Sequence, residues 1–171
     1  MKENALILEQ ILKARKSTFA KDYTGEDIPE AILEKIVESA EYTPNHKRTT
    51  PWRLRVFKGE EKKQLGNVLA EIYKKITLAE SFLEKKYLDI PTKFTQSGAV
   101  ISIVANISGK VAEWEEIAAT SMAVQNMYLT ATVHNIGCYW GTPGMIHHLQ
   151  DYLNLEENQK CLGFFFLGIT E

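Results

Sequence analysis

Residues 99–105 read Ala99-Val-Ile-Ser-Ile-Val-Ala105, a run that is apolar apart from one serine and rich in β-branched side chains. Such a run predicts a central β-strand that is covered on both faces. Working outward, the alternating segment from Arg53 to Lys58 predicts a strand with one solvated face. Residues 136–140 predict a short strand, and residues 161–168 predict a last apolar strand. The sequence therefore predicts one sheet of four strands.

Helical periodicity fills the segments between these strands. The predicted helices cover residues 4–16, 29–41, 60–86, 113–135 and 145–153. Ile90-Pro91 is expected to end the charged helical stretch, because proline breaks a helix interior. The helix over 113–135 carries few charges after Glu116, so we expect it to be buried in the core or in a subunit interface.

The order of these elements predicts the fold class. Pairs of helices alternate with strands, and no repeat or linker interrupts the chain, so residues 1–171 are expected to form a single α+β domain. We expect a small, mixed, mostly antiparallel sheet with helices on both sides. Any parallel strand pair would need a crossover, which the helices provide.

Composition excludes several function classes. The 20 basic and 22 acidic residues give a net charge of -2, which is not the basic excess of a nucleic-acid binder. No apolar run approaches the length of a membrane span, and no secretory signal is recognisable. Cys138 and Cys161 are therefore expected to be free thiols. We expect a cytoplasmic protein that contacts neither nucleic acid nor membrane.

Two polar segments are candidates for a binding site. Residues 42–53 read Tyr42-Thr-Pro-Asn-His-Lys-Arg-Thr-Thr-Pro-Trp-Arg53, a basic loop that is either a solvated connection or a wall of ligand contacts. Its two prolines favour a fixed shape. Residues 15–17, Arg-Lys-Ser, end the first predicted helix. These cations either complement the helix dipole or, with the hydroxyl, hold a phosphate.

A third candidate is the glycine-rich segment around Tyr139 and Trp140. Gly137, Gly141 and Gly144 flank these aromatic residues. The spacing is not the dinucleotide fingerprint, which requires Gly-x-Gly-x-x-Gly at the start of a helix. The glycines either serve the turn itself or leave backbone N–H groups free to face a ligand.

The sequence contains no recognisable catalytic apparatus of its own. It has no Gly-x-Ser-x-Gly elbow, no Walker loop and no His-Glu-x-x-His motif. His134, His147 and His148 lack metal-ligand spacing with Cys138, so no metal site is expected. If the protein is an enzyme, we expect no catalytic side chain and an organic cofactor that carries the chemistry.

The ordered set of these motifs resembles the nitroreductase family of flavin enzymes, in particular its short members. Family members open with a helix that ends in Arg-Arg-Ser, where this chain has Arg15-Lys16-Ser17. They continue with Ala-Pro-(Ser/Asp)-His and then Pro-Trp before a strand, which Thr43–His46 and Pro51-Trp52 match in order and spacing. The long apolar helix, the strand with Trp140 and the final strand follow in the family's order.

The resemblance implies an intertwined homodimer that binds FMN at the subunit interface. NADH or NADPH would be the reductant, and a nitroaromatic, quinone or related small molecule the acceptor. Arg15, Lys16 and Ser17 would hold the phosphate and ribityl oxygens. Trp140, Gly141 and Thr142 would lie against the same flavin, and Tyr42 and His46 would approach it from the partner subunit. Thr50 would lie near the pyrimidine edge.

This chain departs from the family pattern at several of these positions. Lys16 replaces the second arginine, Thr50 stands where relatives often have Gln, and Gly141-Thr142 replaces Arg-Ser. The printed chain ends at Glu171, where many relatives continue into a basic tail. These departures leave two alternatives open, namely a flavin-binding or flavin-handling dimer without efficient turnover, and a dimeric remnant of the fold that serves protein interaction.

Overall fold

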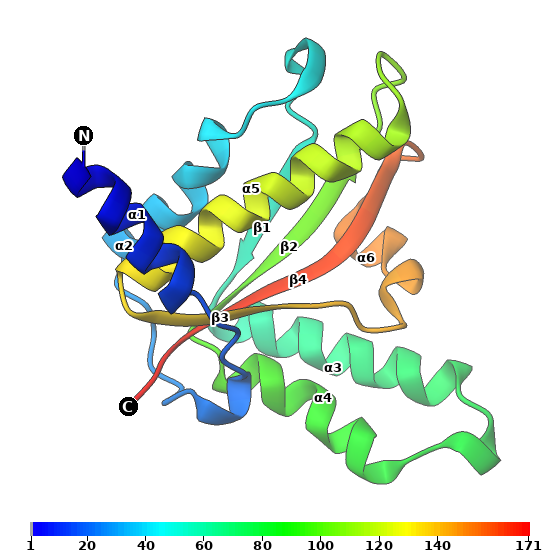
Figure 1. Ribbon diagram of the computed structural model, residues 1–171. Coiled ribbons are helices and arrows are strands. Elements are labelled where there is room, and N and C mark those ends of the chain that lie inside the picture. The colour runs from blue at the N-terminus through cyan, green and yellow to red at the C-terminus, as the bar shows by residue number, and fades with distance from the viewer. Residues whose placement is uncertain (1) are drawn as a thin grey trace.

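The computed structural model describes residues 2–171 and contains one four-stranded sheet in the order β1-β2-β4-β3 (Figure 1). The strands are β1 (Trp52–Phe57), β2 (Ala99–Asn106), β3 (Ile136–Gly141) and β4 (Gln159–Ile169). Each lies where the sequence predicts a strand. The run that predicts a central strand forms β2, which pairs on both sides and is buried along seven of its eight residues.

All three strand pairs are antiparallel. The predicted α+β class is confirmed, but the described strands include no parallel pair, so the sheet is antiparallel rather than mixed. Strands that run in the same direction never become neighbours, because β2 separates β1 from β4 and β4 separates β2 from β3. This order leaves β1 and β3 as the two edges of the sheet.

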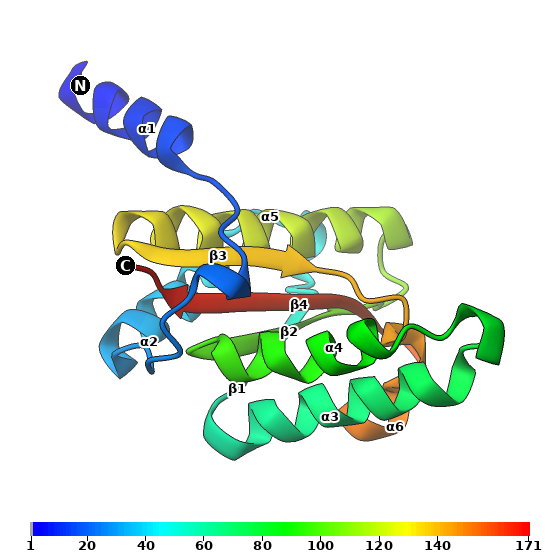
Figure 2. The same ribbon diagram turned by 90° about the horizontal axis from the view of Figure 1, so that it is seen from below.

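Helices cover both faces of the sheet (Figure 2). On one face lie α5 (Glu113–Val133), α2 (Glu30–Glu38) and, further from the sheet, α1 (Lys2–Ala14). On the other face lie α3 (Gly59–Ile76) and α4 (Glu84–Gln96), and α6 (Gln150–Leu153) follows β3. Short 3₁₀ turns span Ala20–Asp22, Ser39–Tyr42, His46–Arg48, Ala79–Ser81 and Ile146–His148.

The predicted helix break at Ile90-Pro91 is wrong. The chain breaks earlier, between α3 and α4, and Pro91 lies inside α4. A proline there costs about 3 kcal/mol of helix propensity. Ile90 and Phe94 on the same helix are buried, and their packing offsets that cost. The Tyr73 hydroxyl also accepts a hydrogen bond of 3.0 Å from the Leu83 amide, which joins the end of α3 to the start of α4.

The two-residue period of the central strands divides the core in two. On β4, Phe165 packs toward α5, whereas Phe164 and Phe166 pack toward α3 and α4. The side toward α5 is mainly aliphatic and includes Met127. The other side carries a set of aromatic rings that includes Phe94. Both layers are fully desolvated, so the sheet gives a rigid support for whatever binds at its edges.

Candidate functional site

The segment Arg15-Lys16-Ser17 lies at the outer edge of β3. The Thr18 amide donates a hydrogen bond of 3.0 Å to the Cys138 carbonyl, which fastens the chain after α1 to this strand. The Arg15 guanidinium lies over the Tyr128 ring, 5.3 Å from its centroid. The Tyr128 hydroxyl accepts a hydrogen bond of 2.7 Å from the Trp140 amide. The structure thus brings Arg15 and Trp140 together across one tyrosine of α5.

Arg15 has no carboxylate partner in the described chain. None of the ion pairs there includes it, and its side chain is half-buried. A guanidinium over an aromatic face has N–H groups that the ring does not satisfy, and these can bind an oxyanion in a bidentate manner. Ser17, two residues further on, is exposed beside it.

The positions around Trp140 are fixed by packing. Its indole N–H donates to the Leu162 carbonyl at 3.0 Å. Gly163 permits this approach, because it has φ +126° and an added Cβ would lie 2.7 Å from the indole nitrogen. An added Cβ at Gly141 would lie 3.0 Å from the Phe166 ring. Glycine at 141 is therefore explained by the aromatic layer beneath it, while Thr142 is exposed.

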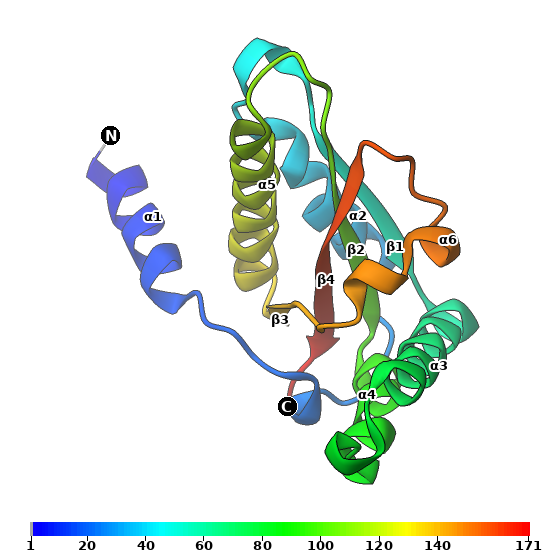
Figure 3. The same cartoon turned by 90° about the vertical axis from the view of Figure 1, so that its right-hand side faces the viewer.

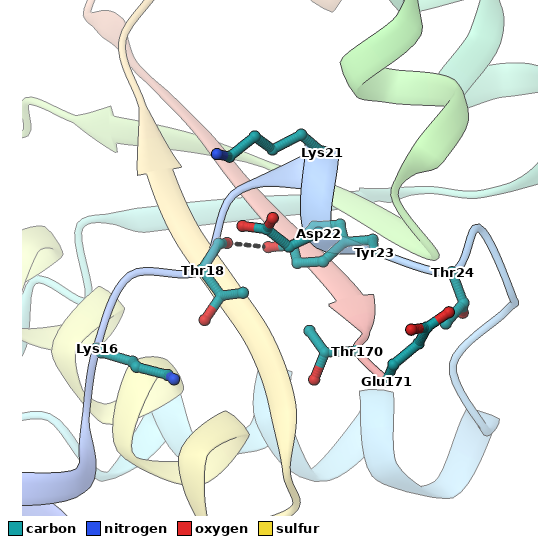
Figure 4. A pocket seen from close by; sticks show the side chains of 8 residues that line it. All are labelled: Lys16, Thr18, Lys21, Asp22, Tyr23, Thr24, Thr170 and Glu171. Atoms are coloured by element: carbon teal, nitrogen blue, oxygen red, sulfur yellow. Dashed lines mark hydrogen bonds between the residues drawn. The ribbon is translucent and has the colours of Figure 1, made fainter.

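Tyr23 anchors the candidate phosphate segment to the sheet (Figure 4). Its hydroxyl donates a hydrogen bond of 2.6 Å to the Thr18 carbonyl, and the side chain is almost fully buried. The ring packs so closely on Gly168 that an added Cβ there would lie 2.3 Å away. Burial raises the pKa of Tyr23 above its ordinary value, so its hydroxyl remains a donor well above neutral pH.

Lys16 lies in different surroundings from Arg15. It lines a polar groove of about 580 Å³ together with Thr18 and Thr170, and Figure 4 shows these side chains around it. A smaller groove of about 220 Å³ on the side of Gly137 also includes Lys16. The three residues of the Arg15-Lys16-Ser17 motif are therefore neighbours in sequence, but its two cations occupy separate environments.

The basic loop over residues 42–53 has a strained backbone, and hydrogen bonds hold it in place. Lys47, Arg48 and Thr50 have φ values of 53°, 52° and 45°, in the left-handed region that is costly for residues other than glycine. The Thr50 amide donates to the Asn45 side chain at 2.9 Å. His46 Nδ1 lies 2.7 Å from Glu115 Oε2 in the first turn of α5.

Within one protomer these residues do not join the first group. His46 contacts Glu115, and Arg15 contacts Tyr128, thirteen residues later on the same helix. At 1.5 Å per residue the two contacts are about 20 Å apart along α5. Tyr42 is 74% exposed and donates to Glu38 rather than to any residue of the β3 edge. Within one chain, His46 and Arg15 therefore lie far apart.

The cysteines do not supply a nucleophile. Both are free thiols, as predicted, and Cys138 is buried under the β3 edge. Burial raises the pKa of Cys138 to about 12, although the nearby Arg15 guanidinium acts in the opposite direction. The thiol therefore stays protonated at neutral pH and is a poor nucleophile. Nor do three potential metal-ligating side chains gather anywhere in the described chain.

The described elements define the fold class, namely an α+β protein with a four-stranded antiparallel sheet. The family model described as "Nitroreductase family" matches residues 12–169, and the chain belongs to this family. None of the helices that the structure describes is both long and apolar enough to span a membrane.

The chain is similar to several known proteins along nearly its whole length. YfhC from Bacillus subtilis (strain 168), provisionally named an NAD(P)H nitroreductase, is 26% identical over 169 residues, which cover 96% of this chain and 85% of YfhC. A nitroreductase-like family protein from Bacillus cereus superposes with a TM-score of 0.78 at 22% identity, covering 95% and 85% of the two chains. The FMN-dependent nitroreductase NfnB from Mycobacterium smegmatis, solved with NADPH, gives 0.77 at 17% identity, covering 98% and 89%.

Sequence reasoning missed three residues that shape the β3 edge. These are Tyr23, Tyr128 and Gly163. Tyr128 could have been found, because a tyrosine in an otherwise apolar helix needs a partner for its hydroxyl. Tyr23 and Gly163 act through contacts that are distant in sequence, with Gly168 and with Trp140, and no local pattern marks them.

Proposed function

We propose that this protein is an FMN-dependent NAD(P)H oxidoreductase that reduces a nitroaromatic, quinone or related acceptor by two electrons. Membership of the nitroreductase family over residues 12–169 carries the proposal. The name of YfhC and the FMN and NADPH named for NfnB support the same cofactors here. Burial raises the pKa of both cysteine thiols, which makes them poor nucleophiles and agrees with chemistry supplied by a cofactor.

The residues at the β3 edge fit FMN. Arg15 is a half-buried guanidinium without a carboxylate, which suits a phosphate, and Ser17 can donate beside it. Trp140, Gly141 and Thr142 end the strand next to Tyr128 and would lie against the isoalloxazine ring. Lys16 lies in the neighbouring groove, so it would attract the phosphate by its charge rather than form bidentate hydrogen bonds together with Arg15.

We further propose that the active form is a homodimer in which each site is completed by the partner. His46 contacts α5 about 20 Å from the contact that Arg15 makes with the same helix, so we expect His46 to serve a flavin across an interface. Helix α1 projects from the body of the protomer (Figure 3) and exposes Leu6 and Leu12 at 60% and 50%. An apolar helix face left in this way is explained by a second copy of the chain.

When bound, FMN would take the hydride of NADH or NADPH and pass two electrons to the acceptor. For a nitro group the step takes one hydride from NAD(P)H and one proton from water or the site: the nitro compound, NAD(P)H and one proton give the nitroso compound, NAD(P)⁺ and water. The protein's part is to bind the phosphate through Arg15, to hold the ring against Trp140, and to leave one ring face open to alternating partners.

The test is a visible spectrum of the purified protein before and after NAD(P)H under anaerobic conditions. We expect a yellow dimer whose flavin absorbance is bleached by NADH or NADPH and restored by menadione or a nitroaromatic. A colourless protein that fails to bind added FMN, or a stable monomer in sedimentation, would contradict the proposal. Bound FMN that NAD(P)H does not bleach would instead support a flavin-handling protein without turnover.

A further inference from the structure

A groove that adjoins the proposed flavin site at Gly141 and Thr142 opens between α4 and the turn after β3. Its inner part, about 230 Å³, is lined by Gly141 and Thr142 on one side and by Phe94 and Phe166 below. Its outer part, about 500 Å³, lies between the first turns of α4 and Met145. Ile90, Lys93 and Pro143 line both parts, so the two are continuous.

The inner part has an aromatic floor of fixed geometry. Tyr139 and Phe166 stack with centroids 4.7 Å apart and an angle of 7° between the rings. Phe94 meets Phe166 edge to face at 5.0 Å. The inner part therefore ends on an apolar aromatic wall, beside the strand end that would face the flavin, which suits an aromatic molecule.

The outer part has a positive rim. Lys85, Lys86 and Lys93 line it, and Asp89 is the one acidic residue among its lining side chains. Asp89 is four residues from both Lys85 and Lys93, the spacing of a helical ion pair. Yet none of the ion pairs in the described chain includes these lysines. Lys86 instead lies 4.7 Å from the centroid of the Tyr73 ring, so Lys85 and Lys93 are left for a ligand.

We infer that this groove selects planar aromatic acceptors that carry a negative charge, such as a nitroaromatic carboxylate, and that Lys93 is its specificity-determining residue. The inference rests on the proposed function, and it adds the substrate class. The aromatic part of the acceptor lies over Tyr139 and Phe166, and its carboxylate points outward to Lys93. We assign the specificity-determining role to Lys93 because it is the one cation that lines both parts of the groove.

The experiment compares para-nitrobenzoate with para-nitrobenzamide, which have nearly the same shape but differ by one charge. Binding to the protein as purified is followed by quenching of the intrinsic protein fluorescence, because Tyr139 lines the inner part of the groove. The rate is then followed with NAD(P)H, and both are measured for Lys93→Gln. The matched control is Lys75→Gln, which removes the same charge from an exposed position on α3 outside the groove.

We expect Lys93→Gln to raise the Kd and KM of para-nitrobenzoate about fivefold, the size of one partly exposed ion pair. The values for para-nitrobenzamide should change less than twofold, and Lys75→Gln should leave both ligands unchanged. Added salt should weaken para-nitrobenzoate in the wild type and not in Lys93→Gln.

The inference is overturned if the two variants behave alike, or if Lys93→Gln weakens both ligands equally. Failure of the proposed function is a separate outcome. A protein without flavin or without NAD(P)H oxidation would contradict the proposed oxidoreductase function. The fluorescence titration would still decide whether the groove prefers the charged ligand. Charge-selective binding without turnover would therefore support the groove and contradict the enzyme.

Discussion

The hydroxyl of Tyr23 gives the sharpest test of how the β3 edge is built. In Tyr23→Phe the ring keeps its packing on Gly168, but the hydrogen bond of 2.6 Å to the Thr18 carbonyl is lost. A partly buried bond of this kind contributes about 1 kcal/mol net. The segment that carries Arg15 and Ser17 then keeps the Thr18 amide bond to Cys138 as its remaining hydrogen bond to β3 in the described structure.

We expect two consequences from this single change. The free energy of unfolding in urea should fall by about 1 kcal/mol. FMN should bind up to about fivefold more weakly, because binding must then also re-order the segment, and 1 kcal/mol corresponds to that factor. Titration of FMN fluorescence gives the Kd, and the two effects are measured on the same preparation.

Tyr73→Phe is the matched control. Tyr73 is also buried, and its hydroxyl also bonds to a backbone group, the Leu83 amide at 3.0 Å. It joins α3 to α4, remote from Arg15, so its loss should lower stability by a similar amount and leave the Kd of FMN unchanged. Equal Kd values for the two variants, whether both weakened or both unaffected, would refute the positioning role of Tyr23.

Three further predictions concern stability and the basic loop. Burial raises the pKa of Cys138 from 9.0 to about 12, so the unfolded chain ionises first as pH rises and stability falls above pH 9. Relative to Cys138→Ala, the wild type should lose about 1 kcal/mol more of its unfolding free energy between pH 7 and 10 in urea titrations. Glu115→Ala removes the partner of His46, so limited trypsin digestion should cleave faster after Lys47, and an unchanged rate would show that this contact does not hold the loop. Pro91→Ala restores an N–H inside α4 and should raise the unfolding free energy by about 1–3 kcal/mol, whereas a decrease would show that the ring itself is needed for packing.

The sequence predicted the strands well because their signal is local. The period-two pattern of β1 and the unbroken apolar run of β2 are direct consequences of one buried face and of two. The absence of parallel pairs could not be predicted in the same way, because the order of the strands in the sheet depends on contacts between residues that are distant in sequence. The predicted helix break at Pro91 was wrong for a related reason, since burial of Ile90 and Phe94 outweighs the unfavourable helix propensity of proline.

The candidate site was predicted as a set of segments, but its geometry was not. The motif at 15–17 lies beside β3, yet sequence adjacency suggested one cluster where the structure has two environments for Arg15 and Lys16. Gly141 was assigned to the flavin side, and its contact with the Phe166 ring is sufficient to explain a glycine there. The roles of the residues toward FMN stay predictions.

The strain in the basic loop bears on the proposed dimer. Three left-handed residues cost roughly 1 kcal/mol each or more, about 3 kcal/mol in total. The contacts that fasten the loop within the chain are largely exposed, such as those of His46 with Glu115 and of Lys47 Nζ with the Lys110 carbonyl at 3.0 Å. Exposed contacts contribute up to about 1 kcal/mol each, so these two offset only part of the strain. A further contact would offset the rest, and the proposed partner site with its flavin would provide one. Strain of this size in the segment that carries His46 and Thr50 therefore favours a loop shaped for binding over a merely solvated connection.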